Sequence, residues 1–251
     1  MTPLRKTALI AGTLYLLTFA SIPTLTLYGP VREPNYIAGP GPDTGVIWGG
    51  VLEMIVALAC IGTAIVLHPV LKRHNEGLAL GFVGIRVLEA ATIIAGIVTL
   101  MSVVTLRQAG AGPEALVTGQ ALIALRDWTF LLGQGFLPAV NALLLGTLLY
   151  QSRLVPQILP LLGLIGAPLL VTSAAATMFG LWDQVSPASA LLTIPIALWE
   201  FSLGAYLIAK GFKPSPITAG MAATNTTAPT RSADIPPGRA MPEVDNRTRD
   251  R

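Results

Sequence analysis

Six long apolar stretches fill most of this sequence, and they restrict the fold to helices that cross a lipid bilayer. A helical span needs about 20 mostly apolar residues, because a helix rises only about 1.5 Å per residue. The predicted spans cover residues 8–28, 46–67, 78–106, 128–150, 156–180 and 188–209. We therefore expect an all-α membrane protein in which six transmembrane helices form one bundle over residues 1–211.

The composition excludes a soluble globular domain. Charged residues make up 12% of the chain, against roughly 25% in soluble domains, so they are too few to cover a water-facing surface. The mean hydropathy is +0.66. The net charge of +3 does not indicate nucleic-acid binding, because the basic residues lie in short loops and in the C-terminal tail. Cys60 is the single cysteine, so no disulfide forms within the chain.

Turn-forming residues separate the spans. Residues 39–42 (Gly-Pro-Gly-Pro) and 110–113 (Gly-Ala-Gly-Pro) cannot continue a helix. Residues 114–127 are predicted to form a short interfacial helix that leads into the fourth span. Residues 212–251 are rich in Thr, Ala, Pro and scattered charges, which predicts a disordered cytoplasmic tail.

The orientation follows from the Lys and Arg residues of short loops, which favour the cytoplasmic side. The predicted spans place seven such residues on one side and three on the other, so both termini are expected in the cytoplasm and the bundle in the bacterial plasma membrane. The two sets are Arg5, Lys6, Lys72, Arg73, Arg153, Lys210 and Lys213 against Arg32, Arg107 and Arg126. An alternative interpretation of the first span is a cleaved secretory signal, because basic residues precede the apolar run.

Four charged residues lie inside the apolar stretches: Glu53, Arg86, Glu89 and Glu200. A charge that faces lipid is costly, so these side chains should face the interior of the bundle. Arg86 stands three residues before Glu89, a spacing that makes neighbours on one helix face, and its fork-shaped guanidinium can also reach Glu200. We predict that the four residues form a cluster that binds a ligand or an ion.

One arginine cannot neutralise three carboxylates. We therefore expect at least one of Glu53 and Glu200 to be protonated near neutral pH, or to reach water through a cavity. Arg126 and Asp127 are not counted in this balance. They are expected at the outer end of the fourth span, where water or headgroups reach them.

Uncharged polar residues extend the predicted interior. Gln134 and Asn141 follow Asp127 at intervals of seven residues, and Thr193 shares a helix face with Glu200. We expect Gln134, Asn141 and Thr193 to line the polar interior of the bundle, where amides bond across helices. A purely structural role is the alternative, because such a network also holds helices in register.

Catalytic and metal-binding motifs are missing from the sequence. It contains no Walker loop, no Gly-x-Gly-x-x-Gly after a strand pattern and no His-Glu-x-x-His. One cysteine and two histidines, His68 and His74, do not make a zinc site. We therefore expect no catalytic residues, no metal and no cofactor.

Several stretches resemble a bacterial family of multi-spanning membrane proteins known as domain of unknown function 4386. They are residues 68–73 (HPVLKR), 84–89 (GIRVLE), 141–156 (NALLLGTLLYQSRLVP), 161–168 (LLGLIGAP), 199–204 (WEFSLG) and 210–212 (KGF). The resemblance covers roughly residues 5–212. It implies the number of spans and a bacterial origin, and it implies no activity.

Three functions remain open at this point. The first is a small carrier or ligand-sensing bundle, which requires a pocket or water path that reaches the charged cluster. The second is a non-catalytic scaffold or subunit of a larger complex, which requires a sealed cluster and a membrane-protein partner. The third is an intramembrane lipid-modifying enzyme with Glu53 or Glu200 as general acid or base. The expected partners are the bilayer and a small ligand or proton, with no nucleic acid.

Overall fold

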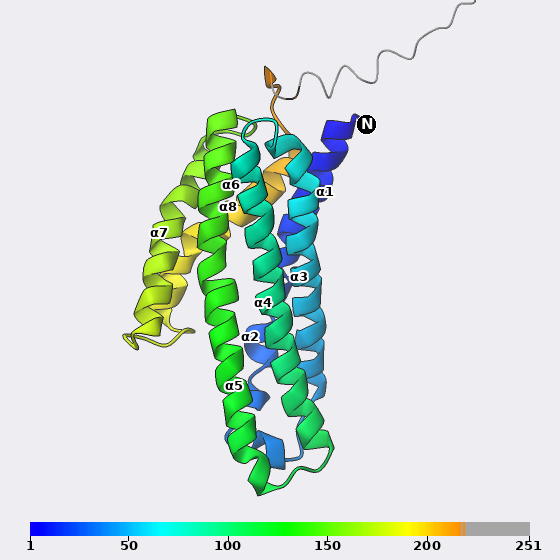
Figure 1. Ribbon diagram of the computed structural model, residues 1–251, viewed down its shortest axis with the longest axis vertical. Coiled ribbons are helices and arrows are strands. Elements are labelled where there is room, and N and C mark those ends of the chain that lie inside the picture. The colour runs from blue at the N-terminus through cyan, green and yellow to red at the C-terminus, as the bar shows by residue number, and fades with distance from the viewer. Residues whose placement is uncertain (217, 219–251) are drawn as a thin grey trace, which may run out of the picture.

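The computed structural model describes residues 1–216 and 218, and within them helices and connecting turns are present but no strand (Figure 1). Six of its helices are long and apolar enough to cross a membrane. The predicted all-α, six-span architecture is therefore confirmed. The tail was predicted over residues 212–251, and from residue 219 onward it lies outside the described residues. Its first part stays attached to the bundle, because the Lys213 amide donates to the Leu154 carbonyl over 2.7 Å.

The first span is broken, whereas the sequence predicted one unbroken helix. Helix α1 (Pro3–Leu17) is followed by a 3₁₀ turn, η1 (Thr18–Ser21), and by a short helix, α2 (Thr24–Leu27). Pro23 carries no amide hydrogen, so it cannot continue the α-helical bonding pattern across this point. The break leaves the chain near Thr18 beside an interior cavity.

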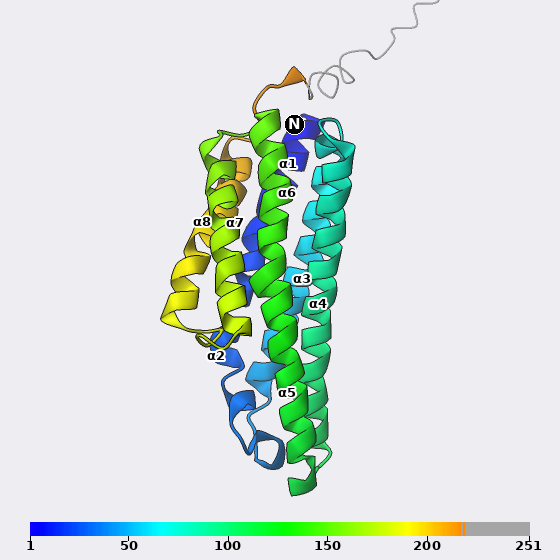
Figure 2. The ribbon, with the colours of Figure 1, turned by 60° about the vertical axis from the view of Figure 1, so that its left-hand side comes forward.

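The next two helices form a long hairpin. After two 3₁₀ turns, η2 (Pro30–Arg32) and η3 (Tyr36–Ala38), helix α3 covers Thr44–Leu71 and helix α4 covers Glu76–Gln108. Asn75 starts α4, since its side-chain oxygen accepts from the Leu78 amide over 3.0 Å. The two helices pack along their whole length, as Figure 2 shows.

The fourth span is a single rod that the sequence analysis divided incorrectly. After the turn η4 (Pro113–Ala115), α5 (Leu116–Phe130) continues through a π-helical segment, η5 (Leu131–Phe136), into α6 (Leu137–Ser152). The predicted interfacial helix over residues 114–127 is therefore collinear with the span and does not lie along the membrane surface. Pro138 has no amide hydrogen, so it cannot donate to the carbonyl of Gln134, four residues earlier. This missing bond accounts for the change from α-helical to π-helical hydrogen bonding at η5.

Two shorter helices close the bundle. Helix α7 covers Ile158–Met178 and α8 covers Pro187–Ala209. Each helix packs on its neighbour in the cyclic order α1, α3, α4, α5–α6, α7, α8 and back to α1.

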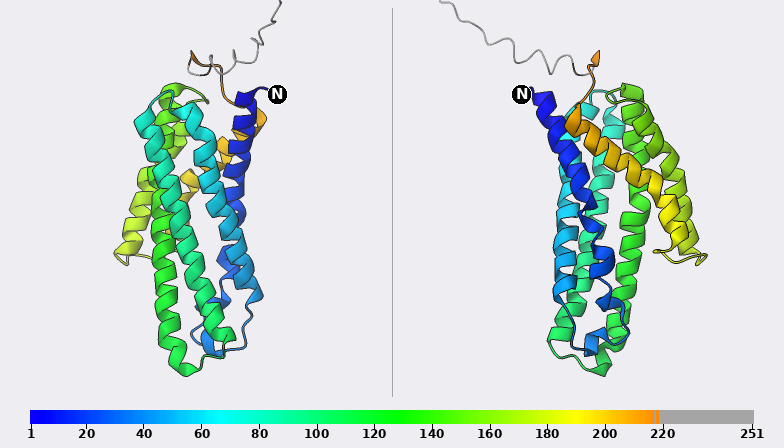
Figure 3. Two further views of the ribbon diagram at one scale, coloured as in Figure 1. Left: turned by 45° about the vertical axis from the view of Figure 1, so that its right-hand side comes forward. Right: turned by 180° about the vertical axis from the view of Figure 1, so that it is seen from behind.

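Figure 3 shows α8 crossing α1 obliquely. Their closest approach is at Gly12, where an added Cβ would lie 2.6 Å from the Gly204 carbonyl. Arg5 also donates to the Leu207 carbonyl over 2.8 Å, so the first span is integral to the fold, which favours a retained span.

The helices differ in length, and this difference indicates the depth of the bundle in a membrane. The rod from Pro113 to Ser152 has 40 residues, which is about 60 Å, twice the roughly 30 Å thickness of the hydrocarbon core. The connection between α7 and α8 lies well short of the distal end, which we define as residues 29–43 and 109–115 (Figure 1). Trp48 and Trp128 are exposed, as is common for aromatic residues at a membrane interface, and we assign the interface to their level. The ends of α4 and α5 therefore extend beyond the bilayer.

Candidate functional site

Arg86 lies at the centre of the first interior cluster. Its side chain is 1% exposed. Its Nη1 lies 2.9 Å from Glu89 Oε2, and its Nη2 lies 3.5 Å from Glu200 Oε1. The three residues predicted together on α4 and α8 therefore meet in the structure. Nη1 also contacts Cys60 Sγ on α3 at 3.5 Å.

Aromatic and amide side chains from other helices complete the surroundings of Arg86. Asn141, with its amide oxygen turned toward the guanidinium, accepts from Nη2 at 3.0 Å and from Nε at 3.3 Å. The ring of Tyr15 lies 5.0 Å from the guanidinium carbon, and that of Phe82 lies 6.0 Å away. Such cation–π contacts stabilise a desolvated guanidinium. Helices α1, α3, α4, α6 and α8 therefore converge on one charge.

Glu53 does not join this cluster, although the sequence analysis grouped it there. It is fully buried and forms a second cluster, in which Oε1 accepts from Arg126 Nη2 at 2.5 Å and from Gln134 Nε2 at 3.1 Å. Its Oε2 accepts from the Tyr28 hydroxyl at 3.1 Å. The register of α3 against α4 and α5 places Glu53 closer to the distal end than Arg86. Both of its carboxylate oxygens accept hydrogen bonds, so Glu53 is satisfied where it stands.

Arg126 is the main functional residue that sequence reasoning misplaced. It was expected at a water-exposed end, but the residue is 5% exposed and pairs with Glu53. Gly96 on α4 lets the two helices approach, because a Cβ there would lie 3.2 Å from Arg126 Cδ. Its neighbour Asp127 does not contact Glu53 and binds Arg32 at 2.6 Å on the exposed surface. The sequence did offer an indication, because Arg126 stands eight residues before Gln134. The sequence analysis instead counted Arg126 among the loop residues.

The π-helical segment η5 explains why Arg126 and Gln134 reach the same carboxylate. Eight residues of an α-helix advance about 80° beyond two full turns, which would place the two side chains on different faces. A π turn contains more residues per rotation and reduces this difference. Both side chains therefore donate to Glu53 Oε1. Segments of this kind occur frequently at functional sites.

A cavity of about 220 Å³, which we call the acidic cavity, adjoins the first cluster. Among the described residues, Glu89 and Glu200 are the charged ones that line it, and Gln134 and Thr193 supply further polar groups. The Glu200 Oε1 atom is buried and has no hydrogen-bond partner with acceptable geometry among the described residues. Thr18 and Ser21, from the break in the first span, line the side opposite α4. The cavity is large enough for several waters, because one water needs only about 10–15 Å³ in this measure.

A second cavity, of about 320 Å³, shares Gln134, Leu170, Thr193 and Ala197 with the acidic cavity. Its further polar lining comes mostly from hydroxyl groups, so we call it the hydroxyl cavity. These groups belong to Ser173, Thr177, Ser186 and Ser189. The shared residues show that the hydroxyl cavity lies beside the acidic cavity, on the side of the connection between α7 and α8.

The interior charges can now be balanced. The described part of the interior contains three carboxylates, Glu53, Glu89 and Glu200, and two guanidiniums, Arg86 and Arg126. Arg126 and Glu53 neutralise each other, which leaves Arg86 with two carboxylates. The unbalanced negative charge therefore lies at the acidic cavity. Within the described residues, no group of three His, Cys, Asp or Glu side chains is close enough to hold a metal ion.

Comparison with known proteins gives one match. The family model described as a domain of unknown function (DUF4386) matches residues 10–211. It covers both interior clusters, the second to sixth membrane helices and most of the first, and it confirms the resemblance found in the sequence. No curated protein and no solved structure matches the chain.

Proposed function

The chain belongs to the DUF4386 family, and for this member we propose the function of a small carrier or ligand-sensing bundle in the bacterial plasma membrane. Its binding site would be the acidic cavity, with Glu200 as the principal ligand-binding group. Glu89 would share the negative charge, and Arg86 would fix the positions of both carboxylates. Gln134 and Thr193 would provide hydrogen bonds to the bound molecule.

The observation that carries this proposal is a cavity of about 220 Å³ that ends on two carboxylates in the middle of membrane helices. Glu200 is the fourteenth residue of the 23-residue helix α8, and Glu89 is the fourteenth residue of α4. An empty polar space at that depth is unfavourable unless water or a ligand fills it. A structural network without a ligand would have no need of this space.

The charge balance selects the ligand class. Arg86 neutralises one of the two carboxylates, so the cavity attracts a cation or a proton. The remaining walls are mostly apolar, including Phe19, Ile93 and Ile196. A small organic cation with an apolar body fits this combination.

The proposal is tested with two probes of equal shape. Purified protein in detergent is titrated with benzylamine, which is a cation at neutral pH, and with benzyl alcohol, which is neutral. We expect the wild-type protein to bind benzylamine at least about tenfold more tightly than the alcohol, as measured by calorimetry. Glu200→Gln should abolish this preference and leave the alcohol affinity unchanged.

The matched control is Glu76→Gln, because Glu76 is exposed at the start of α4 and does not line the cavity. It should retain the wild-type preference. Equal affinity of the wild-type protein for both probes, or a preference that survives in Glu200→Gln, would reject the acidic cavity as a cation site. Uptake of benzylamine by proteoliposomes then separates a carrier from a sensor.

A further inference from the structure

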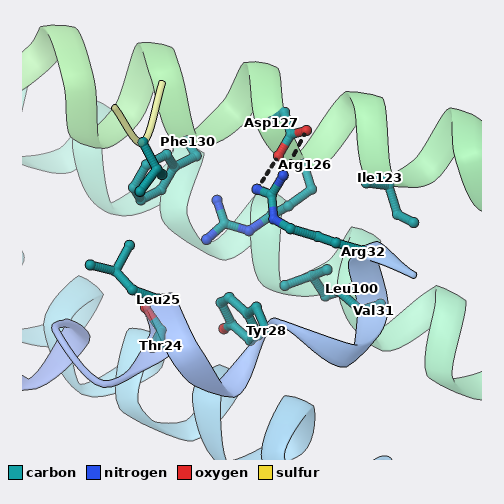
Figure 4. Close-up of a pocket in the computed structure, with 11 residues that line it drawn as sticks. Thr24, Leu25, Tyr28, Val31, Arg32, Leu100, Ile123, Arg126, Asp127 and Phe130 are labelled. Atoms are coloured by element: carbon teal, nitrogen blue, oxygen red, sulfur yellow. Dashed lines mark hydrogen bonds and ion pairs between the residues drawn. The ribbon is translucent and has the colours of Figure 1, made fainter. Parts of the chain in front are cut away.

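We propose a second binding site, for the phosphodiester group of a membrane phospholipid, at the cavity between Arg32 and Arg126. This arginine cavity, of about 50 Å³, lies between α5 and the α2–η2 segment (Figure 4). Both arginines line it, together with Tyr28 and Phe130. The proposal does not depend on the acidic cavity, because it uses no group of that site.

The donors in this cavity are incompletely used. Arg126 has a side chain that is 6% exposed, and Nη2 is its only guanidinium nitrogen with a hydrogen bond to the described residues. Its Nε is buried and has no partner. An unsatisfied buried donor costs about 1–3 kcal/mol, and more when the group is charged. A phosphoryl oxygen in the arginine cavity would satisfy it.

Arg32 supplies the second guanidinium from the exposed side. It is held by Asp127, whose oxygens accept from Nη2 at 2.6 Å and from Nη1 at 3.4 Å. Figure 4 shows this pair joining the η2 turn to α5 at the edge of the cavity. The Arg32 side chain is 54% exposed, so an incoming headgroup can reach it from water. Guanidinium groups bind phosphate with directed, charge-assisted hydrogen bonds.

The depth of the site matches a headgroup. Trp128 follows Asp127 directly and is exposed at the level we assign to the membrane interface. Beside the arginines, Leu25, Phe130 and Val185 line both the arginine cavity and the hydroxyl cavity. Leu25 and Val185 are also largely exposed. An acyl chain can therefore follow this apolar wall while its phosphate contacts the arginines.

The occupant is assigned as a phospholipid because the arginine donors lie directly beside the apolar wall. A phospholipid carries a phosphate group and an acyl chain in the same arrangement. A free phosphate ion would use only the donors, and a neutral diacylglycerol would use only the wall. Phosphatidylglycerol is the suitable probe, since its headgroup beyond the phosphodiester is an uncharged glycerol. Dioleoylglycerol with the same acyl chains and inorganic phosphate are the two comparison probes.

The experiment measures the thermal midpoint of purified protein in detergent with each probe, and lipid retention by native mass spectrometry. We expect phosphatidylglycerol to raise the midpoint and to remain bound, whereas dioleoylglycerol and phosphate at equal concentration do neither. Arg126→Gln alone would leave Glu53 unpaired and disturb folding. The informative variant is therefore Glu53→Gln with Arg126→Gln, which removes the ion pair as a unit.

In this double variant, and in Arg32→Gln, the affinity for phosphatidylglycerol should fall about tenfold. Arg73→Gln is the control, because Arg73 is exposed at the opposite end of the bundle. The proposal is rejected if dioleoylglycerol binds as well as phosphatidylglycerol, if inorganic phosphate alone reproduces the shift, or if both arginine variants keep the wild-type affinity. Glu200 is retained throughout, so failure here is distinguishable from failure of the cation site.

Discussion

Arg86 is the residue on which most helices of the bundle converge. Its guanidinium contacts Glu89, Glu200, Cys60 and, in the orientation described, Asn141. Replacing Arg86 with Met would leave two neighbouring carboxylates without a positive partner. Breaking a buried ion pair from one side costs about 3–5 kcal/mol, so a large fall in the thermal midpoint is expected.

A rescue variant separates lost charge from lost packing at Arg86. Arg86→Met combined with Glu89→Gln and Glu200→Gln carries no interior charge at this cluster and should recover at least half of the lost stability. Arg73→Met, at an exposed position, should change the free energy of unfolding by no more than about 0.5 kcal/mol. If the triple variant is no more stable than Arg86→Met alone, charge balance is not what holds the cluster together.

Asp43 provides a pH-dependent contact outside the membrane-spanning segments. Arg107 donates to both of its oxygens, and Tyr36 and Gln108 add hydrogen bonds at 2.6 and 2.9 Å. The hydrogen bonds from Arg107 hold the pKa of Asp43 at about 2, below its usual 3.8. Because the folded-state pKa is lowered, the stabilisation is present above pH 3.8 and is lost as the pH falls toward 2.

The pH prediction is checked by thermal unfolding of wild-type protein and Asp43→Asn between pH 6 and pH 2. The wild-type protein should be more stable at pH 6 by about 1 kcal/mol, since solvent screens a pair at the distal end. The difference should shrink as the pH falls below 3.8 and be smallest at pH 2, where about half of the folded protein has Asp43 protonated. A constant difference across this range would show that the Asp43 charge does not contribute.

At the level of elements, the contact between α1 and α8 depends on two small residues. An added Cβ at Gly12 would lie 2.6 Å from the Gly204 carbonyl and 2.8 Å from Ile208 Cγ1. Gly12→Ala should therefore force the helices apart and destabilise the bundle by about 1–3 kcal/mol. Gly84→Ala on α4 is the control, because no atom lies within 4 Å of its added Cβ. Equal midpoints for the two variants would contradict the close crossing.

The elements also show what sequence periodicity can and cannot predict. The pairing of Arg86 with Glu89 follows from a spacing of three residues on one helix, so it was predictable. The pairing of Arg126 with Glu53 depends on the register of α3 against α5 and on the π turn at η5, and neither has a period in the sequence. The break at residues 18–23 was missed because the apolar residues on both sides of it outweigh Thr18 and Ser21 in the hydropathy pattern, although Pro23 marks its position.

The whole molecule has two chemically different ends, which lead to a prediction of topology. The N-terminus and the turns α3–α4 and α6–α7 lie at one end (Figure 1), together with the basic residues of residues 72–73 and 153. We expect this end in the cytoplasm. A fluorescent protein fused after Lys213 should therefore fluoresce, and alkaline phosphatase inserted at residues 39–42 should be active. The reverse pattern would contradict the proposed orientation.

The central claim, that the acidic cavity is open to water and negatively charged, is tested most directly by cysteine labelling. The buried Cys60 is first replaced with Ser, so that the protein contains no thiol of its own. A single thiol is then introduced either in the cavity, by Thr193→Cys, or on the exposed face of α8, by Leu198→Cys. Protein in vesicles is treated with a cationic or an anionic methanethiosulfonate, and each rate is normalised to that of a free thiol. We predict modification at position 193 but not at position 198. At position 193 the normalised rate of the cationic reagent should exceed that of the anionic reagent at least about fivefold, and Glu200→Gln should abolish this preference. An unreactive position 193, or equal normalised rates for the two reagents, would contradict the account.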